Sequence, residues 1–475
     1  MDLDLVLLSR LQFAVKAMFH YLYPPLTMGL GVLIVLMEWR FLRTGDKLYE
    51  AMTRFWIKVF ALAFALGVAT GIVMEFEFGS NWSTYSRYVG DVFGSALASE
   101  AIFAFFLESG FLAILVFGWD KVSPRVHFFS TVMVSLGSIF SAIWILVAVS
   151  WMHTPAGHHI VATPWGPRAE ILDFWAMVWN PSLPSRFLHT LVGAFILAAF
   201  FVMSVSAYYV LKGRHLPFAT QSFKLALGMG LLSCLAQPLL GHYSAVVVAK
   251  HQPAKLAAFE GIFAANEPSA PLHLFGIPDP EAGEVTSGGA GRAGNAELFV
   301  HGDWQTPVTG LSAFPREDWP PVGLTFQSYH LMVALGMVML VLTLYAALLL
   351  WRGSLWSTRW LLWVFVFAVG LPYLANQAGW VATEVGRQPW LVHGLLKTGD
   401  GVSKVVRPGE VLTSLTLFTL VYLLLFALFL FVLDRKIKAG PEAVHPPHEE
   451  GAEALRDALS RRGKTSFGLA DTEER

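Results

Sequence analysis

VLTSLTLFTLVYLLLFALFLFVL, residues 411–433, contains no charged side chain. A helix of this length rises about 34 Å, which is enough to cross the hydrocarbon core of a bilayer, about 30 Å thick. WLLWVFVFAVGLPYLA, residues 360–375, is a second apolar run of the same kind. Such runs are typical of transmembrane helices, so the sequence predicts a protein that crosses the membrane several times.

The composition agrees with a membrane protein. The chain has 475 residues, of which 55% are hydrophobic and 14% are charged, and its mean hydropathy is +0.55. Soluble domains carry about 25% charged residues. The net charge of -1 provides no basic footprint for nucleic acid. The single cysteine, Cys234, excludes a disulfide framework, and the N-terminal stretch MDLDLVLLSRLQF does not resemble a cleaved signal peptide.

We expect an all-α polytopic fold with nine transmembrane helices in bundles. Lys and Arg gather in alternate short loops and at the start of the tail, which favours a periplasmic N-terminus and a cytoplasmic C-terminus. The loop 382–410, with four basic residues, is an exception to this majority. The predicted spans are 12–37, 56–76, 93–117, 128–149, 187–211, 225–248, 328–350, 360–381 and 411–433.

The spans divide the chain into four parts. Residues 1–248 hold spans one to six, and residues 328–438 hold spans seven to nine. Between them, residues 249–327 form a long loop on the outer side, and loops of this length are usually functional or disordered. Residues 439–475 are predicted to form a polar cytoplasmic tail.

Two glutamates lie inside the apolar stretch SEAIFAFFLES, residues 99–109. A charged group at the bilayer centre costs roughly 2.5–3.5 kcal/mol on insertion scales, so Glu100 and Glu108 are functional candidates. A buried carboxyl group tends to be neutral and can then both give and accept a proton. The pair therefore predicts a proton relay, with Ser141 of span four at a similar depth. The alternative is two structural hydrogen bonds.

Four further polar groups or potential ligands lie in the predicted spans. His189 and Met332 fall at the same depth near the outer ends of spans five and seven, and a His/Met pair can hold a six-coordinate, electron-transferring haem. His20 lies in span one, and Glu384 ends span eight beside Arg387. The alternatives are a hydrogen-bonded histidine and an interfacial ion pair.

With the N-terminus outside, all of these redox candidates fall in the outer half of the bilayer, close to the long loop, and Glu108 lies deeper. This arrangement favours oxidation of a quinol at the loop, with protons drawn from the opposite side.

These residues lie in longer motifs that carry a family likeness. The chain resembles subunit I of the bacterial cytochrome bd-type quinol oxidases, from the first predicted span to the last. The motifs that carry the resemblance are SRLQFA (9–14), GVATGIVMEFEFGSNW (67–82), SEAIFAFFLES (99–109), SAIWILVAVSWM (141–152), QPAKLAAFEG (252–261), LFGIPD (274–279) and GWVATEVGRQPW (379–390).

The resemblance implies a low-spin haem b (b558), a high-spin haem b (b595) and haem d. It makes His189 and Met332 the axial ligands of b558, and His20 and Glu384 those of the two high-spin haems. Haem d is preferred on His20, although family members differ in this arrangement. Glu100 would lie beside the oxygen-reducing site. Glu108 and Ser141 would belong to the cytoplasmic proton route.

The resemblance also covers the substrate and the partners. Ubiquinol or menaquinol would bind at Lys255 and Glu260, and three further residues would lie beside the high-spin haems, with Arg387 able to pair with a propionate. These three residues are Arg387, Gln388 and Trp390. A second large membrane subunit, subunit II, is implied, and a small single-helix subunit is compatible. The complex would reside in the bacterial inner membrane.

The sequence departs from the family pattern in places. His330 stands where much of the family has arginine, which creates a rival ligand beside Met332, and Val149 stands where some members have asparagine. The quinol loop has the short form, and residues 241–258 resemble a cyanide-insensitive branch. Two other functions stay open at this stage. One is a transporter that uses Glu100 and Glu108, and the other is a haem subunit that reduces quinone without binding oxygen.

Overall fold

The structure is a computed structural model that describes residues 4–102, 106–264, 271–286, 292–294 and 308–442. Within these ranges, eight helices are long and apolar enough to cross a membrane, and Phe106–Phe117 is a shorter apolar helix. The expected all-α polytopic membrane fold is therefore confirmed. Most of the predicted tail, from residue 443 onward, and parts of the long loop lie outside the described residues.

The helices that build the bundle follow one another along the chain, with the long loop between α10 and α13. They are α1 (Leu5–His20), α2 (Pro24–Thr44), α3 (Lys47–Gly79), α5 (Gly90–Glu100), α6 (Phe106–Phe117), α7 (Pro124–His153), α9 (Leu183–Leu211), α10 (Leu216–His251), α13 (Val322–Trp351), α14 (Arg359–Ala368), α15 (Gly370–Val385) and α17 (Pro408–Ala439).

Shorter elements connect these helices. The short helices are α4 (Ser83–Tyr88), α8 (Phe174–Val178), α11 (Pro253–Glu260), η2 (Leu311–Ala313), η3 (Arg316–Asp318), η4 (Leu355–Ser357) and α16 (Thr398–Gly401). The strands pair two by two and antiparallel: β1 (His158–Thr163) with β2 (Gly166–Ile171), β3 (Pro271–His273) with β6 (Arg292–Gly294), β4 (Ile277–Asp279) with β5 (Glu284–Thr286), and β7 (Trp390–Val392) with β8 (Leu396–Lys397).

Two of the predicted spans are broken helices within the described residues. The first divides into α1 and α2 before Pro24, the first residue of α2, because proline favours the first turn of a helix and disfavours its interior. Span eight divides into α14 and α15 at Val369. Span three contains α5, which ends at Glu100, and α6, which begins at Phe106; residues 103–105 between them lie outside the described part of the chain.

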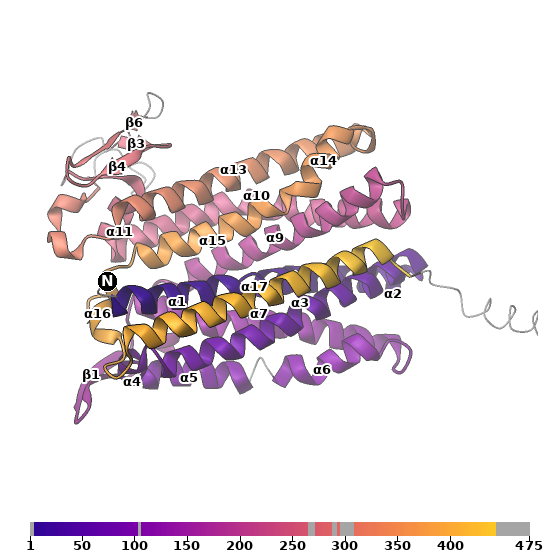
Figure 1. Ribbon diagram of the computed structural model, residues 1–475. Helices are drawn as coiled ribbons and strands as arrows, with labels where there is room; N and C mark the ends of the chain where they lie inside the picture. The colour runs from indigo at the N-terminus through magenta and orange to yellow at the C-terminus, as the bar shows by residue number, and fades with distance from the viewer. Residues whose placement is uncertain (1–3, 103–105, 265–270, 287–291, 295–307, 443–475) are drawn as a thin grey trace, which may run out of the picture.

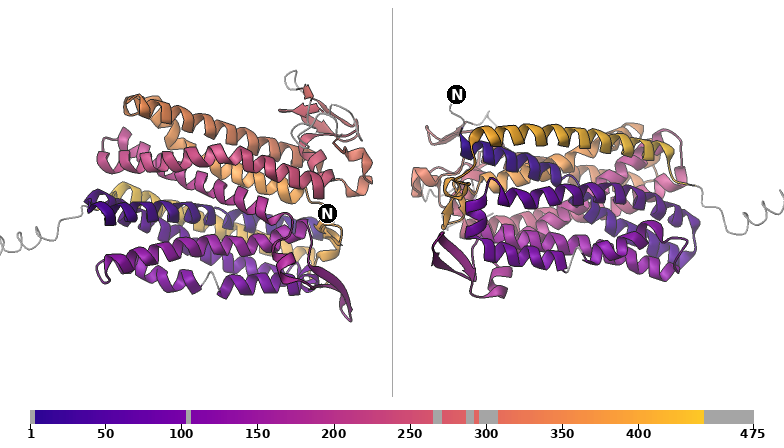
Figure 2. Two further views of the ribbon diagram at one scale, coloured as in Figure 1. Left: turned by 180° about the vertical axis from the view of Figure 1, so that it is seen from behind. Right: turned by 60° about the horizontal axis from the view of Figure 1, so that its bottom comes forward.

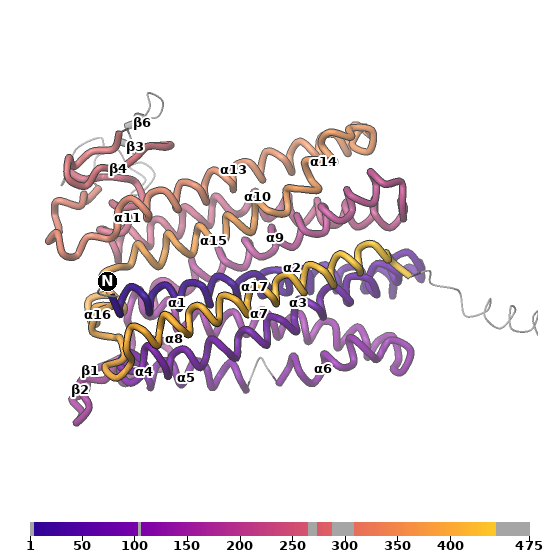
Figure 3. Tube along the Cα trace, viewed as in Figure 1, coloured from indigo at the N-terminus to yellow at the C-terminus, as the bar shows by residue number. Residues whose placement is uncertain are grey.

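The helices form two groups that meet along α9 (Figure 1, Figure 3). In the first group α2 packs on α3 and α7, α6 packs on α7, and α17 lies along α1 and α3. In the second, α10 packs on α9 and α13, and α15 packs on α13. Contacts of α9 with α2 and α7 join the groups, and the core there contains Trp56, Phe60 and Phe200, which are almost fully buried.

The two ends of the bundle differ. The N-terminus, the strands of the long loop, α11 and α16 lie at one end, and the chain leaves α17 at the other (Figure 1, Figure 2). This placement agrees with the predicted sidedness, in which the N-terminus and the long loop share the outer face. We call the first end the loop end and the other the tail end. Helix α17 is mostly exposed and apolar, as expected of a helix that faces lipid or another subunit.

Candidate functional site

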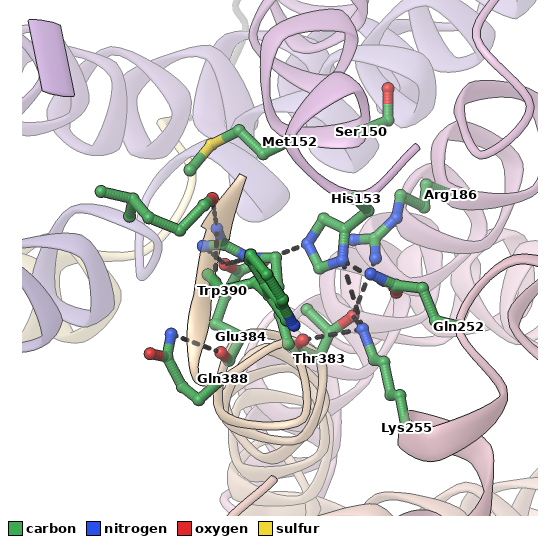
Figure 4. A network of polar contacts seen from close by, with 12 residues as sticks. Ser150, Met152, His153, Arg186, Gln252, Lys255, Thr383, Glu384, Gln388 and Trp390 are labelled. Carbon is green, nitrogen blue, oxygen red and sulfur yellow. Dashed lines mark hydrogen bonds and ion pairs between the residues drawn. The ribbon is translucent and has the colours of Figure 1, made fainter. Parts of the chain in front are cut away.

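Glu384 of α15 is the centre of a polar network at the loop end (Figure 4). Its Oε1 atom lies 3.0 Å from Nε2 of His153, the last residue of α7, and its Oε2 atom accepts a hydrogen bond from Nη2 of Arg387 at 2.5 Å. The ion pair foreseen as the structural alternative is therefore present. Arg387 Nε also donates to Oε2 at 3.2 Å, so Oε1, with one contact, keeps a lone pair for an iron atom, and the ligand role stays a prediction.

Helix α11 of the long loop joins this network through Lys255. The side chain is buried, and its Nζ atom donates to the carbonyl oxygen of Thr383 at 2.7 Å and lies 3.4 Å from Nδ1 of His153. Burial, together with the positive charges of Arg186 and Arg387, holds the pKa of Lys255 well below its usual value. A single imidazole, His153, thus connects the loop helix to Glu384.

His153 and Arg186 were not singled out by the sequence argument. Their only signal in the sequence was their position, since each is a polar residue at the end of an apolar span. Many residues in such positions only face lipid headgroups. In the structure Nη2 of Arg186 donates to Thr383 Oγ1 at 3.2 Å, so three basic side chains surround the one carboxylate of Glu384. This excess of positive charge suits a bound group that carries its own carboxylates, as a haem does.

Glu260, the second predicted quinol residue, points to a different helix from Lys255. It is 7% exposed and accepts a hydrogen bond from the hydroxyl group of Tyr329 on α13. Phe259 stacks on the Tyr329 ring at 4.7 Å and has the Lys255 ammonium group 5.6 Å from its centroid. Burial raises the pKa of the Glu260 carboxyl group, while the Tyr329 hydrogen bond opposes that shift.

His330 uses both ring nitrogens within the protein. Its Nδ1 atom lies 2.9 Å from the carbonyl oxygen of Phe326, and its Nε2 atom lies 2.6 Å from that of His273 in β3. A rival role as haem ligand would break the Nε2 contact, which holds the loop strand against α13. The geometry therefore favours Met332 as the partner of His189.

His189 and Met332 lie on α9 and α13, two helices that both pack against α10 and α15. Glycines of those two helices face the ligands. A Cβ atom added at Gly379 would lie 2.8 Å from Met332 Sδ, and one at Gly241 would lie 3.6 Å from His189 Cε1. Gln237 Oε1 nearby is buried without a hydrogen-bond partner. An imidazole, a thioether and a cradle free of side chains fit a haem.

His20 has the hydrogen-bonding pattern of a metal-binding histidine. The Thr70 hydroxyl group donates to the carbonyl oxygen of Leu66 at 2.7 Å, so its oxygen accepts from Nδ1–H of His20 at 2.9 Å. The tautomer fixed in this way leaves a lone pair on Nε2. Iron-bound histidines commonly donate the other ring N–H in this manner, so His20 fits its predicted role.

The two glutamates of the relay both face α7. Ser141 donates to Glu100 Oε1 at 2.5 Å, and Ser138 is hydrogen-bonded to Glu108, which is 7% exposed. A Cβ atom at Gly137 would overlap the Glu108 side chain, so this glycine makes room for the carboxyl group. The structure brings Ser141 to Glu100 and Ser138 to Glu108, two contacts that the sequence did not predict.

The remaining predicted residues surround Glu384 as well. Gln388 donates to the Glu384 carbonyl oxygen at 3.3 Å and accepts from Thr398 Oγ1 at 2.6 Å. Trp390 begins β7, and its ring lies 5.3 Å from Lys397 Nζ. The Nη1 atom of Arg387 donates to the carbonyl oxygens of Trp390 and Leu391, so Arg387 is already held by protein groups.

Replacing Gly379 with alanine should disturb the thioether ligand, because the new methyl group would displace Met332 Sδ from its position. We expect the low-spin haem signal to decrease and turnover to fall by about tenfold. Gly370→Ala, on the same helix, is the control, because an added Cβ there meets no described atom within 4 Å. Equal spectra for the two variants would place Met332 away from the haem.

An imidazole donor on α9 and a thioether donor on α13, two helices joined through α10 and α15, together with a carboxylate ringed by basic groups, define a haem-binding integral membrane protein. The chain belongs to the cytochrome bd terminal oxidase subunit I family, whose model matches residues 8–441. It is therefore a subunit of a terminal oxidase of the bacterial inner membrane, and the transporter alternative is wrong.

Similar proteins agree with this assignment. Over 94% of its length the chain is 39% identical to cytochrome bd ubiquinol oxidase subunit 1 of Bacillus subtilis (strain 168), with 96% of that protein covered. It is 33% identical to cytochrome bd-II ubiquinol oxidase subunit 1 of Escherichia coli (strain K12), with 94% and 100% of the two chains covered. The bd oxidase structure from Geobacillus thermodenitrificans matches with a TM-score of 0.84 at 29% identity, covering 93% of this chain and all of that one.

Proposed function

We propose that this chain oxidises quinol at its long outer loop and reduces dioxygen to water with protons taken from the cytoplasm. The single observation that carries the proposal is the link through His153, which joins Lys255 of the loop helix to Glu384. The names of the relatives from B. subtilis and E. coli, both ubiquinol oxidases, support the substrate class. Ubiquinol and menaquinol are both compatible with this site.

Three haems are proposed. His189 and Met332 would hold the low-spin haem b558. His20 and Glu384 would hold the high-spin haem b595 and haem d, with haem d preferred on His20. Bound haems would supply electron transfer and activation of dioxygen. Arg186 lies one turn before His189, and its positive charge would balance a propionate where the family arginine is replaced by His330.

At the quinol site the protein groups handle protons. Glu260 would accept one proton of the bound quinol, because a buried carboxylate with a raised pKa is a stronger base than an exposed one. The Tyr329 hydroxyl group orients that carboxylate, and Lys255 would donate a hydrogen bond to the quinone oxygen. These roles are supported by Phe259, whose ring stacks on that of Tyr329 and lies 5.6 Å from the Lys255 ammonium group.

The relay of Glu108, Ser141 and Glu100 would bring protons from the cytoplasm to the site beside His20. Quinol protons would leave on the outer side, while the protons for water would come from inside. Charge therefore crosses the membrane without a proton pump. The support is the pair of hydroxyl contacts from α7, which place both carboxyl groups along one helix.

Membership of a two-subunit oxidase family favours subunit II as the partner, and a small single-helix subunit is compatible with this fold. The exposed apolar surfaces of α13 and α17 would be covered by lipid or by these subunits.

The experiment uses the purified complex in proteoliposomes with a pH-sensitive dye on each side. Quinol addition should drive oxygen uptake, acidify the side that carries the loop and make the opposite side alkaline. Oxygen uptake with both pH changes on one side would overturn the sidedness. Absence of quinol-driven oxygen uptake in a complex with all its haems would overturn the function.

Glu260→Gln should lower quinol oxidation by about 100-fold and leave the haem spectra unchanged. Because the base must be ionised, wild-type activity should fall as the pH drops through the raised pKa of Glu260. Tyr329→Phe removes the hydrogen bond that lowers this pKa, so the acid limb should move to higher pH. A pH–rate profile measures both effects. An unchanged acid limb in Glu260→Gln would remove this residue from the quinol site.

A further inference from the structure

A buried acid–base pair lies near the tail end of the bundle, away from every predicted ligand. Glu38 of α2 is 1% exposed, and its carboxyl group accepts from Thr131 Oγ1 at 2.6 Å and lies 2.7 Å from Nδ1 of His127. His127 is 2% exposed, and its Nε2 atom lies 3.2 Å from the carbonyl oxygen of Leu115 on α6. The contacts therefore join three helices, α2, α6 and α7.

These contacts fix how many protons the pair holds. A carbonyl oxygen only accepts, so Nε2 of His127 must carry a hydrogen. The contact between Glu38 and Nδ1 then needs one more proton, which sits either on the carboxyl group or on the ring. The pair therefore stores one shared proton inside the membrane region with no net charge, which avoids the cost of an isolated buried ion.

The same face of α7 leads from this pair to the two glutamates of the relay. Its polar side chains are spaced four, four, three and three residues apart, which keeps them on one side of the helix. They are His127, Thr131, Ser135, Ser138 and Ser141. The first contacts Glu38, Ser138 is hydrogen-bonded to Glu108, and Ser141 donates to Glu100.

A narrow gap lies between Thr131 and Ser135 on this face. The space there is too tight to hold a water molecule, and it is lined by Gly31, Ile34, Phe60, Leu115, Thr131, Val134 and Ser135. A Cβ atom at Gly31 would lie 3.0 Å from Ser135 Oγ, so the glycine keeps the space beside that hydroxyl group open. Passage of a proton across this stretch would therefore require the packing between α2 and α7 to open enough to admit a water.

The side of the pair toward the tail end is covered by one aromatic ring and an ionic group. The Trp119 ring lies 4.3 Å from that of His127 at 70°, and its Nε1 atom donates to Glu50 Oε1 at 3.1 Å. Arg54 bridges Glu50 to the exposed Asp120. In the predicted orientation Glu50, Arg54 and Asp120 face the cytoplasm. The Trp119 ring thus lies between this charged group and His127.

We propose that Glu38 and His127 are the proton-loading pair of this subunit, which passes protons from cytoplasmic water along the hydroxyl face of α7 to Glu108. The pair releases its shared proton toward Glu108 and is refilled by one proton from water at the Trp119 side, so only O–H and N–H bonds change. This inference rests on the proposed function, in which Glu108 carries protons to the oxygen-reducing site.

The test substitutes Glu38 with glutamine in the full complex. The amide can still donate to His127 and accept from Thr131, so the fold is preserved, but it cannot carry the shared proton. We expect turnover and dye-detected proton uptake to fall together by about tenfold or more, a larger solvent isotope effect, and unchanged haem content. A merely structural pair would not change the isotope effect.

A matched pair of threonines serves as the control. Thr131 and Thr53 are both buried and both donate to the carbonyl oxygen four residues earlier, but Thr131 also contacts Glu38. Thr131→Val should slow proton uptake, and Thr53→Val should not. If Glu38→Gln does not assemble, this pair still decides the question, since equal rates for both threonine variants would overturn the proposal.

Two outcomes distinguish a failure of the loading pair from a failure of the Glu108 relay. Wild-type proton uptake in Glu38→Gln, with uptake blocked in Glu108→Gln, would overturn the loading pair and leave the proposed function intact. Wild-type uptake in Glu108→Gln would overturn the relay itself.

Discussion

Met332→Leu should convert the low-spin haem to a high-spin form and reduce quinol oxidase turnover by at least about 100-fold, while the complex still assembles. Leucine keeps the volume of the side chain but lacks the sulfur atom. The substitution therefore removes the proposed haem ligand with little change in packing. Mutating a residue that only supports a metal ligand typically lowers metal affinity or activity by about 10–100-fold. Met332 is proposed as a ligand itself, so its loss should cost at least as much. Magnetic circular dichroism and the visible spectrum of the reduced complex measure the spin state.

His330→Gln is the matched control for this prediction, because it removes the rival imidazole two residues away on the same helix. Since both ring nitrogens of His330 already contact carbonyl oxygens, we expect its low-spin signal to stay. A low-spin haem that persists in Met332→Leu and disappears in His330→Gln would reverse the assignment.

Glu108→Gln should lower oxygen reduction by about 100-fold, with all haems retained and with electrons still reaching the haems from quinol. Glutamine can keep the contact with Ser138 and fill the space beside Gly137, but it cannot release a proton. The measurement combines an oxygen electrode with stopped-flow haem reduction, which separates electron delivery from proton delivery. Ser109→Ala, next to Glu108 but exposed, is the control. Normal oxygen uptake in Glu108→Gln would exclude this carboxyl group from the proton route.

The apolar segments of the fold were predictable because hydropathy over a window of about 20 residues reports membrane burial directly. The breaks within them were not. A window average does not register the Pro24 break or the break at Val369, since the residues on both sides stay apolar. Each break depends on what the neighbouring helices allow, which is a property of the packed bundle.

The site was partly predictable for a related reason. A carboxyl group inside a span stands out by its cost, so Glu100, Glu108 and Glu384 were found from the sequence. Their partners were not found, because hydroxyl groups of serine are common in helices, and His153 and His127 lie at the two ends of one span, where polar residues are expected. Only the structure brings His153 to Glu384 and His127 to Glu38.

The buried ion pair between Lys16 and Glu77 was missed in the same way. Lys16 lies within the N-terminal apolar segment, and Glu77 lies in a motif that the resemblance identified only as a whole. The two residues are 61 positions apart, so no local spacing rule connects them.

The central claim is that this chain binds haems with these ligands and uses them to oxidise quinol. The most direct test is a dithionite-reduced minus air-oxidised visible spectrum of the purified complex, with chemical extraction of its haems. We expect bands of b-type haem together with a far-red band of haem d. Haem b without haem d would contradict the proposed cofactor set, and a well-folded complex without any haem would contradict the function itself.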